Sequence, residues 1–301
     1  MKTRLKRIVP KRIRSGVRRM KRRWELRRIK KQSQPVTRSQ LVSDFSRLGL
    51  QEGDLLYIHS SLRALGYVAG GAGTVIDALL EAVGPGGTLV LPTFTLVRGM
   101  KETLDGGTHV FDPATSPSTV GKLTNCFLAR PGVLRSEHPT HSVAALGPLA
   151  GEVTATHLEE GMNFGQGTPF EKILEGDGKV VGLGVDFSPI TFYHTFEEYH
   201  PERYPGVYLP GAFTAKIKTG KNVREVRVLC HDPEYHRQRI DKVREIERYF
   251  ASYYHAQGVA HTGRVGSGGV PSWWMRARDV MKCLDELYAK GVTIYKTPNL
   301  P

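Results

Sequence analysis

Residues 54–92 contain a strand, a crossover helix and a second strand, and this pattern constrains the fold more than any other part of the chain. Residues 54–59 and 87–92 are compact apolar runs with the length of buried strands, and residues 74–83 between them have the pattern of a helix. Two strands joined through a helix pair in parallel, because the crossover returns the chain to the same end of the sheet. We therefore predict an α/β fold.

Further elements flank this unit. Thr37 or Ser39 suits the N-cap of a helix that runs through Leu48, and Gly49 suits the position after its end. The other predicted elements are a strand at 179–185, hairpin arms at 213–219 and 224–230, and helices at 234–257 and 272–290. The expected architecture is a mixed, largely parallel central sheet flanked by helices, with a C-terminal hairpin and long helices.

The positive charge of the chain is confined to its first 33 residues. That segment contains 16 Lys and Arg side chains and one acidic residue, Glu25, which gives +15. The remainder contains 27 basic and 28 acidic side chains, which gives −1 and a chain total of +14. We therefore divide the chain into a basic N-terminal arm, residues 1–34, and a single folded domain, residues 35–301. The balanced charge of the domain argues against a nucleic-acid-binding fold.

The basic arm has the pattern of an amphipathic helix. Its apolar residues recur at spacings of four, three and four, and they are Ile13, Val17, Met20 and Trp24. Such a helix binds an anionic membrane surface, because each basic residue contributes roughly 1 kcal/mol there. A disordered or protein-binding arm is the alternative, and nucleic acid is the partner that we favour least.

No apolar run reaches the length that a signal peptide or a membrane-spanning helix requires. Cys126, Cys230 and Cys283 are scattered without the spacing of a metal or redox motif. We therefore expect a cytoplasmic protein with reduced thiols, held peripherally at the inner face of the membrane if the arm binds lipid.

A glycine-rich segment joins the first strand to the next helix. Residues 67–74 contain three glycines, so backbone N–H groups can approach an anion where a helix begins. The diphosphate of a coenzyme would suit this loop. A plain turn, with Thr74 and Asp77 as capping residues, explains the same pattern.

Histidines and a carboxylate mark two further segments. His138 and His141 lie in a Pro-containing loop within residues 136–147, an arrangement that core packing does not require. His194 and Glu197 are three residues apart, which places both on one face if the segment is helical. Histidine is the side chain best suited to accept a proton near neutral pH, and a neighbouring carboxylate can fix its tautomer.

Together these motifs resemble the aminoglycoside 3-N-acetyltransferase family, of the antibiotic N-acetyltransferase type. The matching segments are residues 59–62, 136–147, 193–199, 263–267 and 277–281. The resemblance implies an N-acetyltransferase in which an amine attacks the thioester of acetyl-CoA directly, without a metal. It leaves out the basic arm.

The resemblance also implies site residues. His138 and His194 are the two candidates for the general base, and Glu197 is the candidate for the carboxylate that orients it. His141 is not matched to the family motif, and we place it, with the neighbouring Glu198, among the substrate-binding residues. The residues assigned to acetyl-CoA are His59, Ser60, Ser61, Leu62, Gly71, Thr74 and, for its hydroxyl group, Thr93.

The implied substrate is a small-molecule amine, an amino sugar. It is either an aminoglycoside antibiotic, as in antibiotic resistance, or a nucleotide- or lipid-linked precursor of polysaccharide biosynthesis. The basic arm favours the second, because a soluble antibiotic does not call for a protein at a membrane surface. The sequence does not decide the oligomeric state, and a homo-oligomer is one of the states that it allows.

Three other functions fit parts of the sequence. A zinc-dependent amidohydrolase would draw its ligands from His138, His141, His157, His194 and Glu197, although no HExxH-type helix accompanies them. A cysteine acyl-enzyme would use Cys126, which we place in a buried helix. A non-catalytic CoA-binding module, recruited to membranes by the basic arm, would bind the coenzyme without turnover.

Overall fold

The computed structural model describes residues 34–158 and 161–296. The predicted membrane-binding helix of the basic arm lies outside the described residues. Within the described ranges, no helix combines the length and the apolar composition needed to cross a bilayer.

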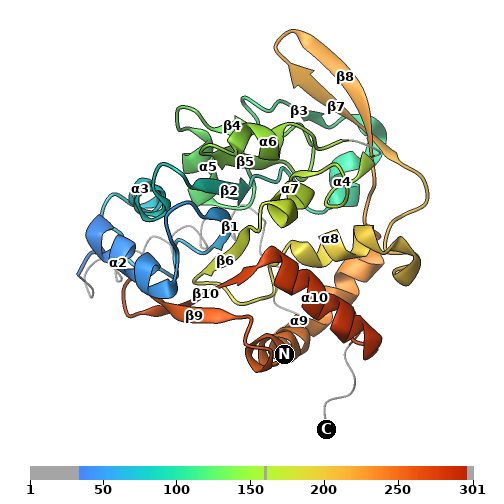
Figure 1. Cartoon of the computed structure of the whole chain (residues 1–301). Coiled ribbons are helices and arrows are strands. Elements are labelled where there is room, and N and C mark those ends of the chain that lie inside the picture. The colour runs from blue at the N-terminus through green and yellow to red at the C-terminus, as the bar shows by residue number, and fades with distance from the viewer. Residues whose placement is uncertain (1–33, 159–160, 297–301) are drawn as a thin grey trace, which may run out of the picture.

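A seven-stranded mixed sheet runs through the molecule (Figure 1). In spatial order, its strands are β4 (Leu134–Arg135), β5 (Val143–Leu146), β2 (Thr88–Pro92), β1 (Leu55–Ser60), β6 (Lys179–Leu183), β10 (Val270–Arg276) and β9 (His261–Val265). The central strands β2, β1 and β6 pair in parallel, and the outer strands pair antiparallel. The predicted mixed α/β sheet is confirmed, with its parallel part at the centre.

The predicted strand, crossover and strand unit is also confirmed. The crossover helix α3 (Ala72–Val83) begins two residues earlier than predicted, directly after Gly71, whose φ of 69° favours glycine. No side chain caps α3. The capping pair expected from Thr74 and Asp77 is therefore wrong.

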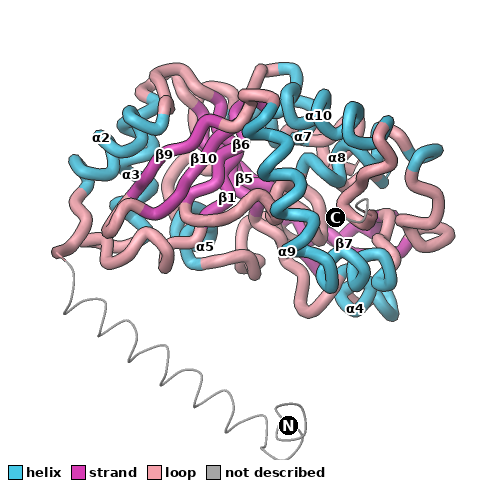
Figure 2. The backbone as a smooth tube through the Cα atoms, turned by 90° about the horizontal axis from the view of Figure 1, so that it is seen from below, coloured by secondary structure: helices cyan, strands magenta, loops and turns pink. Residues whose placement is uncertain are grey.

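Helices cover both faces of the sheet (Figure 2). On one face, α2, α3 and α5 bury a cluster that includes Phe45 and Ile58. On the other face, α6 to α10 bury a cluster that includes Tyr57 and Phe192. The bounds are α2 Arg38–Leu48, α5 Lys122–Leu128, α6 Ala150–Thr154, α7 Pro169–Glu175, α8 Phe192–Tyr199, α9 Pro233–Ala256 and α10 Ala277–Ala289. The predicted caps of α2 are present, with a Thr37–Gln40 capping box and Gly49 at φ 97°.

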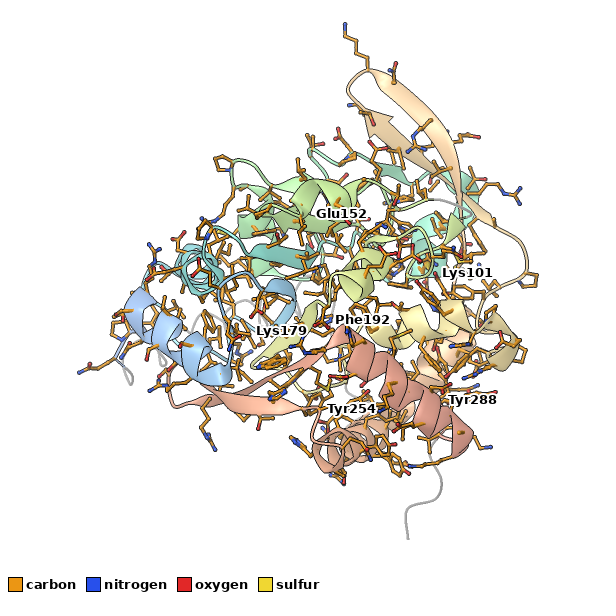
Figure 3. The ribbon with its side chains drawn as sticks, viewed as in Figure 1. Lys101, Glu152, Lys179, Phe192, Tyr254 and Tyr288 are labelled. Carbon is orange, nitrogen blue, oxygen red and sulfur yellow. The ribbon has the colours of Figure 1, made fainter. Side chains whose placement is uncertain are left out.

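Alternation along β1 decides which layer each side chain enters. Tyr57 packs with the α6 to α10 layer and Ile58 with the α2, α3 and α5 layer. His59 therefore faces the same layer as Tyr57, and the two rings meet edge-on at 5.0 Å. Phe192 of α8, near the centre of Figure 3, lies 5.9 Å from the Tyr57 ring. This packing fixes α8 beside β1.

One predicted helix is partly a strand. We expected a helix over residues 272–290, but its first five residues belong to β10 and only Ala277–Ala289 forms α10. Trp273 and Trp274 are both buried, one in each layer, because β10 lies between β6 and β9. A strand buried on both faces lacks the polar alternation that identifies strands, which explains the wrong prediction.

The predicted hairpin is confirmed, but it lies outside the central sheet. β7 (Phe213–Thr219) and β8 (Asn222–Val228) pair antiparallel, and β3 (Val110–Phe111) completes a three-stranded sheet. This sheet and α4 (Met100–Leu104) share an apolar cluster of their own. In Figure 1 the hairpin projects away from the central sheet. Short 3-10 helices are η2 (Asp105–Gly107) and η4 (Pro201–Arg203).

Candidate active site

The candidate site lies where β1 and β6 end. In open α/β sheets, ligands bind at the carboxyl ends of the parallel strands. His59 is at this end of β1. After β6 the chain turns through residues 184–191 into α8, which carries His194 and Glu197. The predicted helical placement of this pair is confirmed.

His194 and Glu197 form a hydrogen-bonded pair, which we call the dyad. His194 Nδ1 lies 2.7 Å from Glu197 Oε2. His231, from the segment after β8, places its Nε2 3.5 Å from the same oxygen. The Glu197 side chain is 1% exposed and the His194 side chain is 19% exposed. The imidazole is therefore the member of the dyad that an arriving substrate can reach.

Arg239 of α9 fixes the tautomer of His194. Its Nη1 lies 2.7 Å from His194 Nε2. Because a guanidinium only donates hydrogen bonds, Nε2 accepts, and we assign the ring proton to Nδ1, which donates to Glu197. In this state His194 is neutral, with its lone pair at Nε2.

The surroundings keep a neutral imidazole beside an ionised carboxylate. Burial lowers the pKa of His194 to about 4; Glu197 acts in the opposite direction, and the charges of His231 and Arg239 lower the pKa further. Burial alone would raise the pKa of Glu197, but the charge and the hydrogen bond of His194 hold it well below its usual range. The carboxylate can therefore stabilise a proton that His194 accepts.

A second group, the buried histidine cluster, consists of His138, His141 and His157. The His138 ring lies 4.7 Å from the His157 ring and 5.8 Å from the His141 ring. His138 Nδ1 accepts hydrogen bonds from the backbone N–H groups of Thr140, at 3.2 Å, and His141, at 2.9 Å. The loop thus folds around the His138 ring.

All three rings of this cluster are neutral near pH 7. Burial lowers the pKa of His157 to about 4. Burial, followed by the neighbouring histidines, lowers the pKa of His138 and of His141 well below the usual range. Since His138 Nδ1 is an acceptor, its proton is on the buried Nε2, and a side-chain hydrogen bond with Asn163 partly opposes the lowering of the His138 pKa. His138 therefore has no free lone pair with which to accept a proton.

Phe164 connects the cluster to the dyad. Its ring lies 4.8 Å from His141 and 5.3 Å from His194. The buried Glu198 carboxylate holds the loop of this ring, because it accepts hydrogen bonds from the backbone N–H groups of residues 163–165. These bonds engage Glu198 within the protein. The substrate-binding roles of Glu198 and His141 stay predictions.

The residues assigned to acetyl-CoA come from the ends of β1 and β2 and from the start of α3. His59, Ser60, Ser61 and Leu62 lead from β1 into the loop, and Gly71 and Thr74 lie where α3 begins. Burial, and then the charge of Arg239, lowers the pKa of His59 to about 3. Thr93 is fully buried, and its hydroxyl donates to the Ser142 carbonyl at 3.0 Å and accepts from Arg135 Nε at 3.2 Å. These coenzyme-binding roles stay predictions.

Sequence reasoning missed two site residues, His231 and Arg239. His231 follows β8 with no recognisable spacing to the other histidines. Arg239 is one of many charged residues in α9. Only the fold brings the end of the hairpin and the second turn of α9 onto the dyad.

The dyad and His231 also form a potential metal site. One ligand atom from each of His194, Glu197 and His231 lies within 4.8 Å of the others. Two histidines and a carboxylate are a set that zinc uses. Arg239 opposes a cation here, because its guanidinium already lies on His194. This set differs from the predicted zinc ligands, which included residues of the buried histidine cluster.

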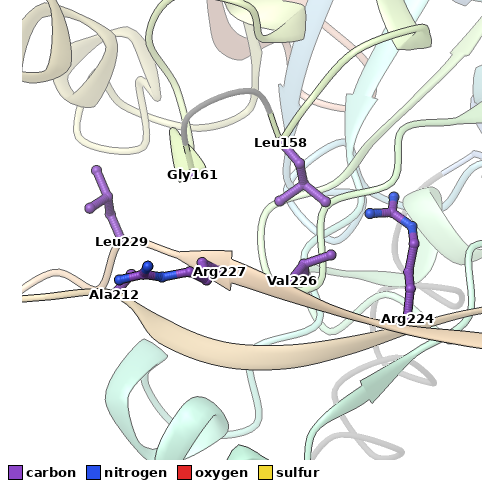
Figure 4. A pocket seen from close by; sticks show the side chains of 7 residues that line it. All are labelled: Leu158, Gly161, Ala212, Arg224, Val226, Arg227 and Leu229. Atoms are coloured by element: carbon purple, nitrogen blue, oxygen red, sulfur yellow. The ribbon is translucent and has the colours of Figure 1, made fainter.

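A pocket of about 480 Å³ lies between the loop before Phe164 and the β7–β8 hairpin (Figure 4). It is lined by Leu158, Gly161, Ala212, Arg224, Val226, Arg227 and Leu229. Arg224 pairs with Glu137 at 2.7 Å. The pocket shares the segment after β8 with His231, and its charged lining is cationic.

Cys126 is remote from this chemistry. It lies on α5 and packs, half-buried, against the α2, α3 and α5 layer. The dyad belongs to the opposite layer, so the cysteine alternative does not share the site.

Known proteins resemble this chain in sequence and in fold. The profile of a family described as aminoglycoside 3-N-acetyltransferase matches residues 57–289. The aminoglycoside N(3)-acetyltransferase III of Salmonella sp. is 40% identical over 172 residues, which are 54% of this chain and 60% of the relative. This chain thus spans about three fifths of the length of the curated relatives that it matches.

Solved structures agree over most of the chain. The aminoglycoside acetyltransferase AAC(3)-Xa superposes with a TM-score of 0.71 at 28% identity, covering 86% of this chain and 94% of its own. The binary complex of AAC-IIIb with CoASH gives 0.70 at 25% identity, covering 88% and 100%. The family profile covers well over half of the sequence, and the chain therefore belongs to the aminoglycoside 3-N-acetyltransferase family.

Proposed function

We propose that this protein transfers the acetyl group of acetyl-CoA to the amine of an amino sugar, with His194 as general base and Glu197 as its orienting carboxylate. Family membership supports the reaction type. The CoASH complex of AAC-IIIb supports the coenzyme. The complex of AAC(3)-IVa with apramycin supports an amino-sugar acceptor.

The single observation that carries the mechanism is the 2.7 Å hydrogen bond between His194 Nδ1 and Glu197 Oε2. A sugar ammonium must lose a proton before its nitrogen can attack, and His194 Nε2 accepts that proton. Glu197 stabilises the imidazolium that forms. The nitrogen then bonds to the thioester carbon and loses its second proton as the carbon–sulfur bond breaks. The departing thiolate takes up that proton and leaves as CoA, and the proton held by His194 passes to solvent.

His194 suits the role of base better than His138. The Nδ1 lone pair of His138 is held by two backbone N–H groups, and its Nε2 carries the proton. His138 has ring neighbours but no carboxylate to stabilise a charge. We assign it a structural role, in which it shapes the loop next to the acceptor site.

Two classes of acceptor fit the proposal. Aminoglycoside antibiotics are favoured by the names of the relatives. Nucleotide- or lipid-linked amino sugars are favoured by the basic arm. His141 and Glu198 belong to the proposed acceptor side, with Glu198 acting through the backbone of residues 163–165.

The test is release of CoA thiol from acetyl-CoA by the full chain, across aminoglycosides and amino-sugar phosphates. The proposal expects release that depends on the amine and on a saturable acetyl-CoA site. Acetyl-CoA binding without release for any amine would favour the non-catalytic module. Release of acetate from an N-acetyl sugar, dependent on bound zinc, would favour an amidohydrolase that uses His194, Glu197 and His231 as ligands.

A further inference from the structure

Arg239 occupies the atom on which the proposed reaction depends. Its Nη1 lies 2.7 Å from His194 Nε2, and its Nη2 lies 2.6 Å from the Ser188 carbonyl. Its guanidinium also lies 5.5 Å from the centre of the Tyr193 ring. The arginine is therefore held by one ring nitrogen, one carbonyl and one aromatic face.

This contact blocks the base. An imidazole nitrogen has one lone pair, and here that lone pair accepts from Arg239. The other ring nitrogen is committed to Glu197 at 2.7 Å. His194 can accept a proton from an amine only after Arg239 has moved away from Nε2.

An anionic group is the ligand that would move Arg239. A guanidinium binds phosphate or carboxylate through two parallel hydrogen bonds, which are stronger than bonds to a neutral nitrogen. Among the described side chains, which leave out those of residues 240–242, no ion pair joins Arg239 to a carboxylate. A bound ligand can therefore supply the phosphate or carboxylate that a guanidinium binds most strongly.

The charged groups around Arg239 also favour an anionic ligand. Arg239 faces the place that an ammonium must enter, and like charges repel there. Glu197 and Glu198 are both engaged within the protein. The nearby pocket is lined by Arg227 and by Arg224, which pairs with Glu137 (Figure 4). These groups favour an acceptor that carries negative charge over a polycation.

We infer that Arg239 is a specificity residue that exchanges its bond to His194 for a phosphate or carboxylate group on the acceptor, and so releases Nε2 for the amine. The consequence for proton transfer rests on the proposed function. The exchange of His194 for an anion as the partner of Arg239 is a binding event in itself. The phosphates of the acyl donor lie a full pantetheine arm from the thioester, so the acceptor is the source of the anion.

The exchange can be observed without turnover. The full chain, labelled with ¹⁵N at histidine, is titrated with inorganic phosphate and with glucosamine 6-phosphate while the His194 resonances are followed by NMR. We expect both probes to shift the His194 Nε2 resonance in the wild type and not in Arg239→Gln. The matched control is Arg237→Gln on the same helix, where Arg237 is 65% exposed and pairs with Glu234; it should respond like the wild type.

Steady-state kinetics provide a second test of the role of Arg239. We expect kcat/KM for glucosamine 6-phosphate to exceed that for glucosamine by at least about tenfold in the wild type. Arg239→Gln should remove this preference mainly through KM, and Arg239→Lys should restore part of it. Replacing acetyl-CoA with acetyl-pantetheine should leave the preference unchanged. A preference that follows the phosphates of the donor instead would overturn the inference.

The two proposals fail separately. Unchanged His194 resonances in the wild type with both probes would overturn the role of Arg239, even if acetyl transfer is observed. A phosphate response that requires Arg239 would support that role even if no amine is acetylated, and that outcome would count against the proposed function alone.

Discussion

The dyad and the buried histidine cluster use the same residue type in opposite settings. His194 is 19% exposed, donates to a carboxylate through Nδ1 and accepts from the Arg239 side chain at Nε2. His138 is fully buried, and backbone N–H groups occupy its only lone pair. A partner carboxylate that can stabilise an imidazolium, rather than a lowered pKa, therefore distinguishes the proposed base from a structural histidine. Burial lowers the pKa in both settings.

We expect the largest effect from removing the negative charge of Glu197. Glu197→Gln should lower kcat by roughly 100- to 10,000-fold, because an amide can donate to Nδ1 and place the ring proton on Nε2. The measurement is steady-state CoA release at saturating acetyl-CoA. Glu202→Gln, a change at a side chain 66% exposed on η4, is the control and should stay within about twofold of wild type. A Glu197→Gln enzyme with near-normal kcat would remove the dyad from the mechanism.

For the free energy of unfolding, we expect a larger loss from a substitution at His138 than from one at His194. His138→Ala should lower the free energy of unfolding by about 1–3 kcal/mol, because two buried N–H groups lose their acceptor. His194→Ala should cost clearly less, since that side chain is partly exposed. Urea unfolding of both variants at pH 7.5 makes the comparison. Equal losses would mean that the two settings differ less than their contacts indicate.

The third prediction concerns pH. His157 has its pKa lowered from 6.5 to about 4 by burial, so the unfolded chain binds a proton that the folded protein does not bind. Its contribution to stability is therefore complete above pH 6.5 and declines as the pH falls towards 4, by about 1.4 kcal/mol per pH unit. Unfolding measured between pH 7 and pH 5 should show the summed slope of all the buried histidines, and His157→Gln should flatten it by the contribution of one group. A slope that is the same in both proteins would contradict a neutral buried His157.

We expect no effect on kcat when metal ions are removed. If the amine attacks the thioester directly, treatment with a chelator should leave kcat unchanged. Metal content and activity should be measured before and after dialysis against EDTA. Loss of activity that zinc restores would instead assign His194, Glu197 and His231 to a metal.

Much of the fold follows from local pattern. The apolar runs of β1 and β2 with a helix between them predict the parallel centre of the sheet, and the caps of α2 predict its bounds. The β10 strand could not be identified in this way, because Trp273 and Trp274 enter opposite layers and both are buried. A pattern without polar alternation does not separate a buried strand from a helix.

The site was predictable only where its chemistry is local in sequence. His194 and Glu197 are three residues apart on one helix, so spacing alone brings them together. Arg239 and His231 come from α9 and from the end of the hairpin, and their approach to the dyad depends on long-range packing. Sequence spacing also cannot show that the backbone occupies the lone pair of His138.

The central claim is that His194, and not His138, accepts the proton of the amine. The most direct measurement compares His194→Gln with His138→Gln for CoA release from acetyl-CoA, normalised to the folded fraction and to acetyl-CoA binding. We expect His194→Gln to bind acetyl-CoA but to lose turnover, whereas His138→Gln should keep turnover per folded molecule. Loss of turnover in folded His138→Gln with turnover retained in His194→Gln would contradict it.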